Sequence, residues 1–255
     1  MHPASSVIFF TTASGAGFGI MSWLSIAILM GHYILTPQTI FMGVIGLVLA
    51  GAGLLSSTLH LGNPQRAWRA FSQWRSSWLS REGILAVLTC INFAAILGLY
   101  MISGLVLPMM AGSCLVLSLL TIVATAMIYA QIKPVPRWHT KLTVLCYLGF
   151  STSTGLAVIA TVSPTRYHIY LAFGGLVLAW VFKLFWWKRA RHTKLSHDGS
   201  STATATGLIG FSSVKLFEKP HMTKNYLMTE MVFEIGRKHA SRLRQISFLT
   251  GGLIP

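Results

Sequence analysis

A histidine and a glutamate frame the most distinctive stretch of the sequence. The segment from His60 to Glu82 is rich in Arg and Trp and separates two long apolar runs. If those runs are helices, both side chains lie at the same depth, at one face of a membrane. Burial or a neighbouring charge can bring His and Glu side chains to exchange protons near neutral pH. The pair could therefore take up the protons that a lipid-soluble quinol releases as it gives up its electrons.

Aromatic residues inside this segment are candidates for the wall of such a pocket. They are Trp68, Phe71, Trp74 and Trp78. Trp is also enriched at membrane interfaces without binding any ligand, so an anchoring role stays open for all four.

A purely structural explanation of the same segment also stays open. Gly62 and Pro64 would end the helix that carries His60. Ser80 would be the N-cap of the next helix, with Glu82 in its first turn.

The remaining histidines and the cysteines argue against an intrinsic cofactor. A haem within the membrane needs axial ligands, usually His, that face each other from within spans. The histidines instead lie in expected loops and tails or at span ends: His2, His139, His192, His197, His221 and His239, and His32, His60 and His168. The cysteines stand singly on three spans, at positions 90, 114 and 146. We expect no haem, metal or cluster in this chain.

Small residues in the first apolar run have a simpler explanation than nucleotide binding. Gly15, Gly17 and Gly19 form a GxGxG pattern, but no strand precedes it to support a phosphate site. Small residues let helices approach closely in a bilayer. We therefore expect these glycines to pack helices.

Composition identifies the elements that must position these residues. Hydrophobic residues make up 53% of the 255 residues and charged residues only 10%, against about 25% charged in soluble domains. Residues 2–65 and 83–132 contain no Asp, Glu, Lys or Arg. Each stretch is long enough for two helices of about 20 residues. A soluble enzyme and a disordered chain are excluded.

The predicted fold is all-α, a polytopic transmembrane helix bundle with six complete spans plus a truncated seventh, within residues 1–192 and 246–255. The six spans are expected at 8–31, 40–61, 83–103, 109–130, 142–162 and 168–187. A seventh would begin near Ile246, where about half the length of a span remains. We therefore expect the sequence to be a fragment.

Basic residues predict the orientation. The face that carries the N-terminus and the loops 62–82, 131–141 and 188–244 holds 18 of the 20 Lys and Arg residues, whereas Arg166 lies on the opposite face. Short loops rich in Lys and Arg remain in the cytoplasm. We expect the N-terminus and the basic loops to be cytoplasmic, in a bacterial inner membrane. The net charge of +15 then meets anionic lipid or an acidic protein rather than nucleic acid.

The segment after the sixth span divides into two parts. Residues 193–213 are small and polar, which is typical of a flexible linker. Residues 214–245 include apolar residues at helical spacing from Leu227 to Leu243, with acidic residues early and basic residues late. This pattern predicts an amphipathic cytoplasmic helix, which would either lie on lipid or dock a partner subunit.

Several motifs together resemble a known family. Leu59-His60-Leu61-Gly62-Asn63-Pro64-Gln65-Arg66-Ala67 followed by Leu79-Ser80-Arg81-Glu82 is similar to the membrane-anchor subunit of DMSO-reductase-type molybdoenzymes. Residues 2–12, 225–228 and 237–240 resemble the branch that serves cytoplasm-facing complexes of the sulfite dehydrogenase type.

The resemblance implies a bundle of about eight helices without a redox cofactor of its own. It would anchor an iron–sulfur subunit and a molybdopterin catalytic subunit, and would exchange electrons between quinone or quinol and the nearest iron–sulfur cluster. The family's quinol-site histidine falls on His60 and its acidic residue on Glu82. This chain lacks room for the last two helices.

The residues assigned from these arguments form two sets. We expect quinone binding at His60, Glu82, Trp68 and Trp78. We expect contacts to the partner subunits at Arg66, Arg69, Arg75, Arg237 and Lys238. Two other classes stay open: a permease or channel without a redox role, and a purely structural anchor. The substrate chemistry would in any case lie on a partner subunit.

Overall fold

The computed structural model describes residues 5–31, 36–58, 63–133, 135–193, 201–210, 214–215 and 238–253. Within these ranges the regular elements are all helical. Residues 5–186 form one compact unit, and the described residues from 187 onward belong to a second. The predicted all-α class is confirmed.

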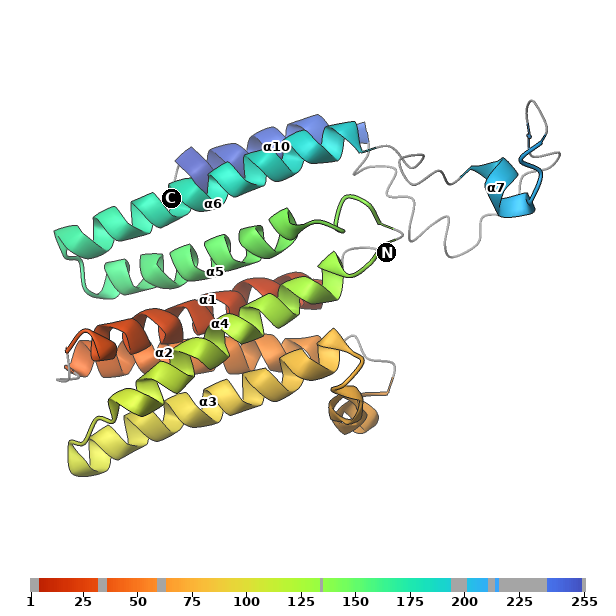
Figure 1. Ribbon diagram of the computed structural model, residues 1–255. Coiled ribbons are helices and arrows are strands. Elements are labelled where there is room, and N and C mark those ends of the chain that lie inside the picture. Colours follow the sequence, from red (N-terminus) through yellow and green to blue (C-terminus); the bar gives the residue numbers. More distant parts are fainter. Residues whose placement is uncertain are drawn as a thin grey trace. The chain divides into compact units, whose positions relative to one another are not determined.

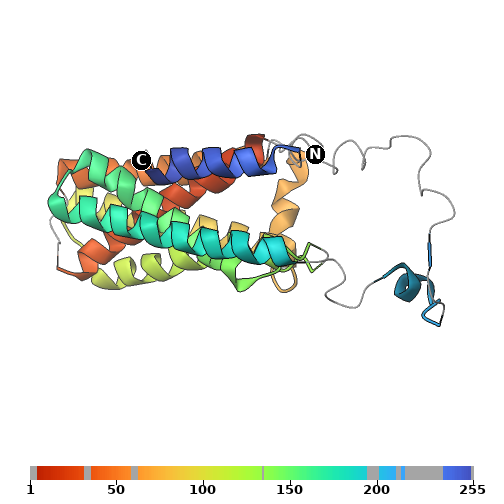
Figure 2. The same ribbon diagram turned by 90° about the horizontal axis from the view of Figure 1, so that it is seen from above.

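In the part of the chain that the structure describes, six long helices are apolar and long enough to cross a membrane. They are α1 (Ser5–Leu29), α2 (Pro37–Thr58), α3 (Trp78–Ser103), α4 (Pro108–Ala130), α5 (Lys141–Val162) and α6 (Arg166–His192). Figures 1 and 2 show the helices from α1 to α5 running side by side with alternating direction. The prediction of six spans is confirmed, and the chain is a multi-pass membrane protein.

Local signals in the sequence set several helix ends. Pro37 and Pro108 each stand at the first position of a helix, where a missing N–H costs nothing. Gly104 ends α3 with a positive φ of 67°, and its N–H donates to the Tyr100 carbonyl at 2.8 Å. The α6 helix continues past the predicted end to His192, because basic residues suit the last turn of a helix.

The α1 helix is the centre of the bundle and packs against α2, α4 and α5. Phe18, Ile20, Met21 and Ile28 of α1 are fully buried. By contrast, large apolar side chains on outer helix faces are exposed, among them Ile102 at 89%. An apolar outer surface of this kind is what a lipid environment permits.

Glycines allow the closest helix contacts, as the sequence predicts. A Cβ atom at Gly17 would lie 2.6 Å from the Gly46 carbonyl oxygen of α2. A Cβ at Gly19 would overlap the backbone of Ser151 in α5, and one at Gly155 would overlap the backbone of Gly19. Backbone packing of this kind is typical of small residues in membrane helices. The GxGxG pattern therefore lets α1 pack closely against α2 and α5.

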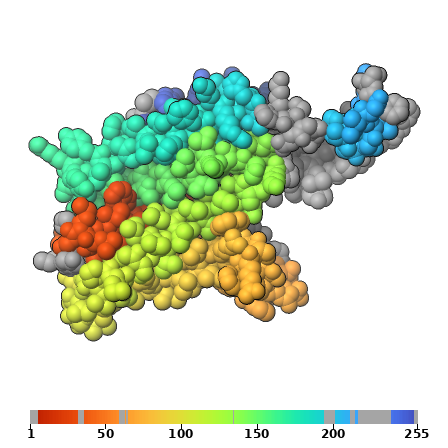
Figure 3. Space-filling view, viewed as in Figure 1, coloured from red at the N-terminus to blue at the C-terminus, as the bar shows by residue number. Residues whose placement is uncertain are grey.

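A short 3-10 helix, η1 (Pro64–Gln73), connects α2 to α3. It packs against the start of α3, where Phe71 lies against Gly83. In Figure 3 the η1 surface, drawn in orange, protrudes at the end of the bundle where α3 begins. The basic residues of loops 62–82 and 131–141 share this end, whereas Arg166 begins α6 at the other. We call the end with η1 the basic end and the end with Arg166 the opposite end.

The second unit holds short helices. They are α7 (Thr202–Thr206), α10 (Ala240–Phe248) and η3 (Leu249–Leu253). Ser201 and Thr204 form a capping box on α7, within the segment predicted as a linker. Ile246 lies inside α10 rather than at the start of a span, and the six spans found in the described residues do not include this region. The truncated seventh span is not confirmed.

Candidate functional site

Glu82 is a carboxylate buried within a membrane bundle. It is the one acidic residue among the first 197, and only 3% of its surface is exposed. The hydroxyl of Thr125, in α4, donates a hydrogen bond to Glu82 Oε1. A buried carboxylate is costly without such a partner, so this contact positions the group and stabilises it.

The Thr125 hydroxyl lies within reach of two acceptors. One is Glu82 and the other is the Thr121 carbonyl oxygen, 3.0 Å away. When Glu82 is ionised, Thr125 donates to the carboxylate; when Glu82 is protonated, its carboxyl can donate to Thr125, whose own proton then goes to the Thr121 carbonyl. Glu82 therefore keeps a hydrogen-bond partner with or without a proton. A group that exchanges protons needs that property.

Further hydroxyl groups continue the polar interface of α3 with α4. Thr89 and Thr121 are buried, and their hydroxyl oxygens lie 3.2 Å apart. Ser80 is 1% exposed, and its Oγ has no hydrogen-bond partner within the described ranges. A buried hydroxyl without a partner is available to a ligand. Ser80 lies two residues from Glu82.

Two stacked tyrosines line a cavity at the basic end of the bundle. Tyr129 of α4 and Tyr147 of α5 stack with ring centroids 5.8 Å apart. Tyr147 lines a small void together with Thr125. It also lines two larger cavities of about 270 and 430 Å³, which extend to Lys183. Tyr147 therefore borders both the void beside Thr125 and the larger cavities at the basic end.

Aromatic rings from two further elements enclose the smaller of these cavities. Trp138 packs edge-on against Tyr129, with centroids 5.6 Å apart. Trp186 of α6 donates its indole N–H to the Thr143 hydroxyl at 3.2 Å. Both rings line the cavity of about 270 Å³. Sequence reasoning missed Tyr129, Tyr147 and these walls, because their proximity to Glu82 depends on how α3, α4 and α5 pack.

Arg81, in the first turns of α3, fastens the segment between η1 and α3 to that helix by hydrogen bonds. Its Nε donates to the Trp74 carbonyl at 2.9 Å, and its Nη2 donates to the Arg75 carbonyl at 2.6 Å. The guanidinium also lies 4.4 Å from the centroid of the Trp78 ring. Sequence reasoning gave Arg81 no such role, although its place directly before Glu82 was visible.

The capping prediction for α3 is wrong. The helix begins at Trp78, and its N-cap is Ser77, whose Oγ accepts a hydrogen bond from the Ser80 N–H at 3.4 Å. Ser80 is therefore inside the helix, and Glu82 lies beyond the first turn. Ser77, three residues before Ser80, has the extended backbone that an N-cap requires.

Comparison with known proteins identifies the family. The family model described as the DMSO reductase anchor subunit (DmsC) matches residues 1–195. The chain belongs to the DMSO reductase anchor subunit family. It is 37% identical over 185 residues to the C subunit of sulfite dehydrogenase from Allochromatium vinosum, a match that covers 64% of this chain and 56% of that protein. No solved structure matches the chain at a significant level.

The predicted quinone-binding residues of this anchor subunit are only partly brought together. His60 lies outside the described residues. Trp78 and Glu82 are one turn apart on α3, with Trp78 half-buried beside Arg81. Trp68 is 65% exposed on η1, and neither Trp68 nor Glu82 lines the cavities of about 270 and 430 Å³.

The predicted partner-binding residues of the anchor subunit are accessible where they are described. Arg66, Arg69 and Arg75 are exposed in the segment that Arg81 fastens. Arg69 lies over the neighbouring Trp68 ring at 5.6 Å. Lys238 is exposed in the second unit, and Arg237 lies outside the described residues.

The described part of the anchor subunit offers no metal centre. No group of three His, Cys, Asp or Glu side chains is placed to hold a metal ion there. Cys90, Cys114 and Cys146 are free thiols. Their positions on three different helices give no shared ligand set.

Proposed function

We propose that this anchor subunit exchanges electrons and protons between the membrane quinone pool and an iron–sulfur subunit, within a molybdopterin oxidoreductase complex. The observation that carries the proposal is the buried Glu82, which retains a hydrogen-bond partner in both protonation states. Family membership supports the anchoring role. Iron–sulfur clusters and molybdopterin would belong to the partner subunits.

The chemistry at Glu82 follows from the balance of the quinone reaction. Reduction of a quinone consumes two electrons and two protons, and oxidation of the quinol returns them. We assign one proton to Glu82, with the second at the predicted His60. The relative is named for sulfite dehydrogenase, and the oxidation of sulfite releases electrons. Quinone reduction is therefore the proposed direction, in which Glu82 donates its proton.

The proton must reach Glu82 from water at the basic end. Thr125 contacts the carboxyl directly, and Tyr147 lines a void together with Thr125. Beyond Tyr147 lie the two cavities that extend toward Lys183. This row of hydroxyl groups is the proposed route for proton uptake, because each can accept and donate a hydrogen bond.

The proposed orientation places the partner subunits in the cytoplasm. Arg66, Arg69 and Arg75 are at the basic end, and short loops rich in Lys and Arg remain cytoplasmic in bacterial inner membranes. Their exposed side chains lie on a segment that Arg81 fastens to α3. We assign them to the docking of the iron–sulfur subunit, together with Arg237 and Lys238 from the C-terminal segment.

Replacement of Glu82 tests the proposal. The complex is purified with its partner subunits, and two rates are measured: electron transfer to a quinone and electron transfer to an artificial dye that bypasses the membrane. Glu82→Gln keeps a hydrogen-bonding side chain but cannot donate a carboxyl proton. We expect the quinone rate to be lost and the dye rate to be retained. Glu230→Gln is the matched control, since it removes a carboxylate from the C-terminal segment.

An unchanged quinone rate in Glu82→Gln would refute the assigned site. If complex assembly depended on this chain while no substitution changed the quinone rate selectively, the chain would be a structural anchor alone.

A further inference from the structure

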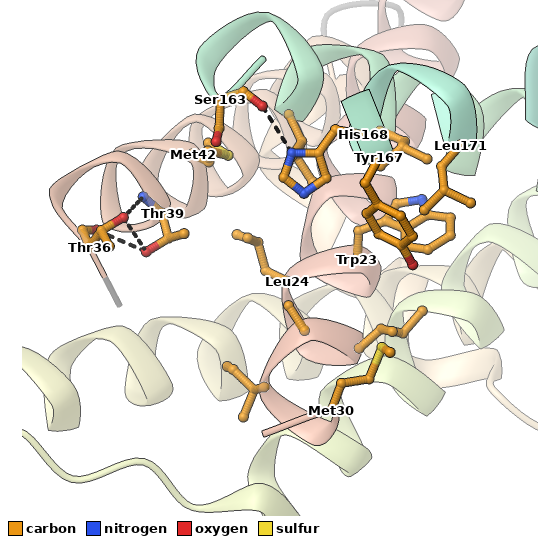
Figure 4. A pocket seen from close by; sticks show the side chains of 15 residues that line it. Trp23, Leu24, Met30, Thr36, Thr39, Met42, Ser163, Tyr167, His168 and Leu171 are labelled. Atoms are coloured by element: carbon orange, nitrogen blue, oxygen red, sulfur yellow. Dashed lines mark hydrogen bonds between the residues drawn. The ribbon is translucent and has the colours of Figure 1, made fainter. Parts of the chain in front are cut away.

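A further cavity, here called the opposite-end cavity, lies at the opposite end of the bundle, away from Glu82. It has a volume of about 580 Å³ and is formed by α1, α2, α5 and α6. Its walls are mainly apolar, with Leu24 and Ile28 of α1 among them, and the aromatic rings of Trp23 and Tyr167 lie at one side (Figure 4). The volume falls in the range of about 300–1,000 Å³ that small-molecule sites occupy.

His168 places a hydrogen-bonding atom in this apolar cavity. Its Nδ1 lies 2.9 Å from the Ser163 carbonyl oxygen, and its backbone N–H donates to the Thr165 hydroxyl at 3.1 Å. A carbonyl oxygen only accepts, so Nδ1 must carry the proton. In the neutral ring the other nitrogen, Nε2, is then an acceptor. Figure 4 shows the ring directed into the cavity, with Nε2 facing away from Ser163.

Two other polar groups of the cavity already have partners. The Trp23 indole N–H donates to the Thr152 carbonyl at 3.0 Å. The Thr39 hydroxyl donates to the Thr36 carbonyl at 2.8 Å. The cavity therefore combines aromatic and aliphatic walls with an acceptor atom held in a fixed orientation by Ser163.

We propose that this cavity binds a quinol, with a ring hydroxyl donating to His168 Nε2. The required chemistry is a hydroxyl on an apolar body, and quinols combine that hydroxyl with a flat ring that suits Trp23 and Tyr167. A phospholipid phosphate is itself an acceptor and does not match a neutral Nε2. The oxidised quinone also presents only acceptors, so it cannot form this hydrogen bond with Nε2.

This site is separate from the proposed proton site at Glu82. The void beside Thr125 is lined by Ser14 of α1, whereas the opposite-end cavity is lined by Ala27 of the same helix. At about 1.5 Å of rise per residue, these positions are about 20 Å apart along α1. The second site needs no contact with Glu82 and no electron transfer, and it goes beyond the proposed function.

Equilibrium binding of decylubiquinol tests the proposal. The purified complex is placed in phosphatidylglycerol nanodiscs under reducing conditions, and bound quinol is extracted and counted at increasing concentrations. His168→Asn keeps an N–H donor for the Ser163 carbonyl but lacks the Nε2 acceptor. We expect it to weaken one class of binding sites about fivefold, the effect of a single hydrogen bond. His139→Asn is the matched control, because His139 Nδ1 makes the same kind of contact with the Ala130 carbonyl at 2.7 Å.

A second pair of variants tests the cavity without altering His168. Ala27→Phe fills part of the cavity and should remove this class of sites. Ala95→Phe places the same ring on an exposed position of α3 and should leave binding unchanged. Glu82→Gln should not affect the class of sites that Ala27→Phe removes, which separates this proposal from the proposed function.

Three outcomes would overturn the quinol assignment. One is full binding in both His168→Asn and Ala27→Phe. Another is equal affinity for decylubiquinone, because the oxidised ring has no hydroxyl to donate. The third is displacement of the quinol by dodecanol at the same concentration, which would identify the occupant as a membrane alcohol.

Discussion

The Thr125 hydroxyl allows a quantitative test of the proton site. Thr125→Val preserves the approximate shape of the side chain and removes the group that contacts Glu82. The ionised carboxylate then loses its donor, so release of the proton from Glu82 becomes more costly. Hydrogen bonds to charged groups contribute about 1.5–3 kcal/mol, and each 1.4 kcal/mol corresponds to a factor of ten. If proton release limits turnover, the quinone rate should fall by about 10- to 100-fold.

The assay compares quinone reduction with dye reduction in the same purified complex. Thr125→Ser restores a hydroxyl and should recover most of the quinone rate. Thr89→Val is the matched control, because Thr89 is buried in the same α3–α4 interface and bonds Thr121 and the Leu85 carbonyl rather than Glu82. It should lower thermal stability by about 1 kcal/mol and leave the quinone rate nearly unchanged.

Two results would refute this reasoning. One is a Thr125→Val complex whose quinone rate stays within twofold of the original. The other is an equal loss of quinone rate in Thr89→Val while that complex remains assembled. In the second case the variants would report on packing between α3 and α4 rather than on Glu82.

Three further predictions concern packing, the basic segment and orientation. Gly19→Leu should abolish accumulation of folded protein in the membrane, because the added side chain would overlap α5, whereas Gly51→Leu meets open space and should accumulate normally. Arg81→Gln should increase cleavage of the η1 segment by chymotrypsin, because two carbonyl hydrogen bonds are lost, and Arg69→Gln should not. A periplasmic reporter fused at Gly104 should be active, whereas activity at residue 137 would contradict the proposed orientation.

The sequence predicted the membrane helices well because their signals are local. The two charge-free stretches predicted four of the six spans found in the described residues, and Pro37, Pro108 and Gly104 lie at helix ends in the structure. The N-cap of α3 was predicted wrongly because Ser77 and Ser80 are both suitable residues. Only the backbone conformation distinguishes them.

The surroundings of Glu82 could not be predicted from the sequence. Thr125 belongs to a different helix, and nothing in its local pattern distinguishes it from Thr121 one turn earlier. The choice between them depends on how α4 rotates against α3. The same holds for Tyr147, which reaches the site from α5, and for Trp68, whose type suggested a pocket wall but whose position is exposed.

Three consecutive residues of α3 perform three different tasks. Arg81 fastens the basic segment, Glu82 faces α4, and Gly83 receives the Phe71 ring. Neighbouring positions on a helix point about 100° apart, so each of these three residues faces a different part of the structure. Inserting or deleting one residue between Ser77 and Arg81 would turn all three directions together relative to the start of the helix, so the length of this short stretch should tolerate little change.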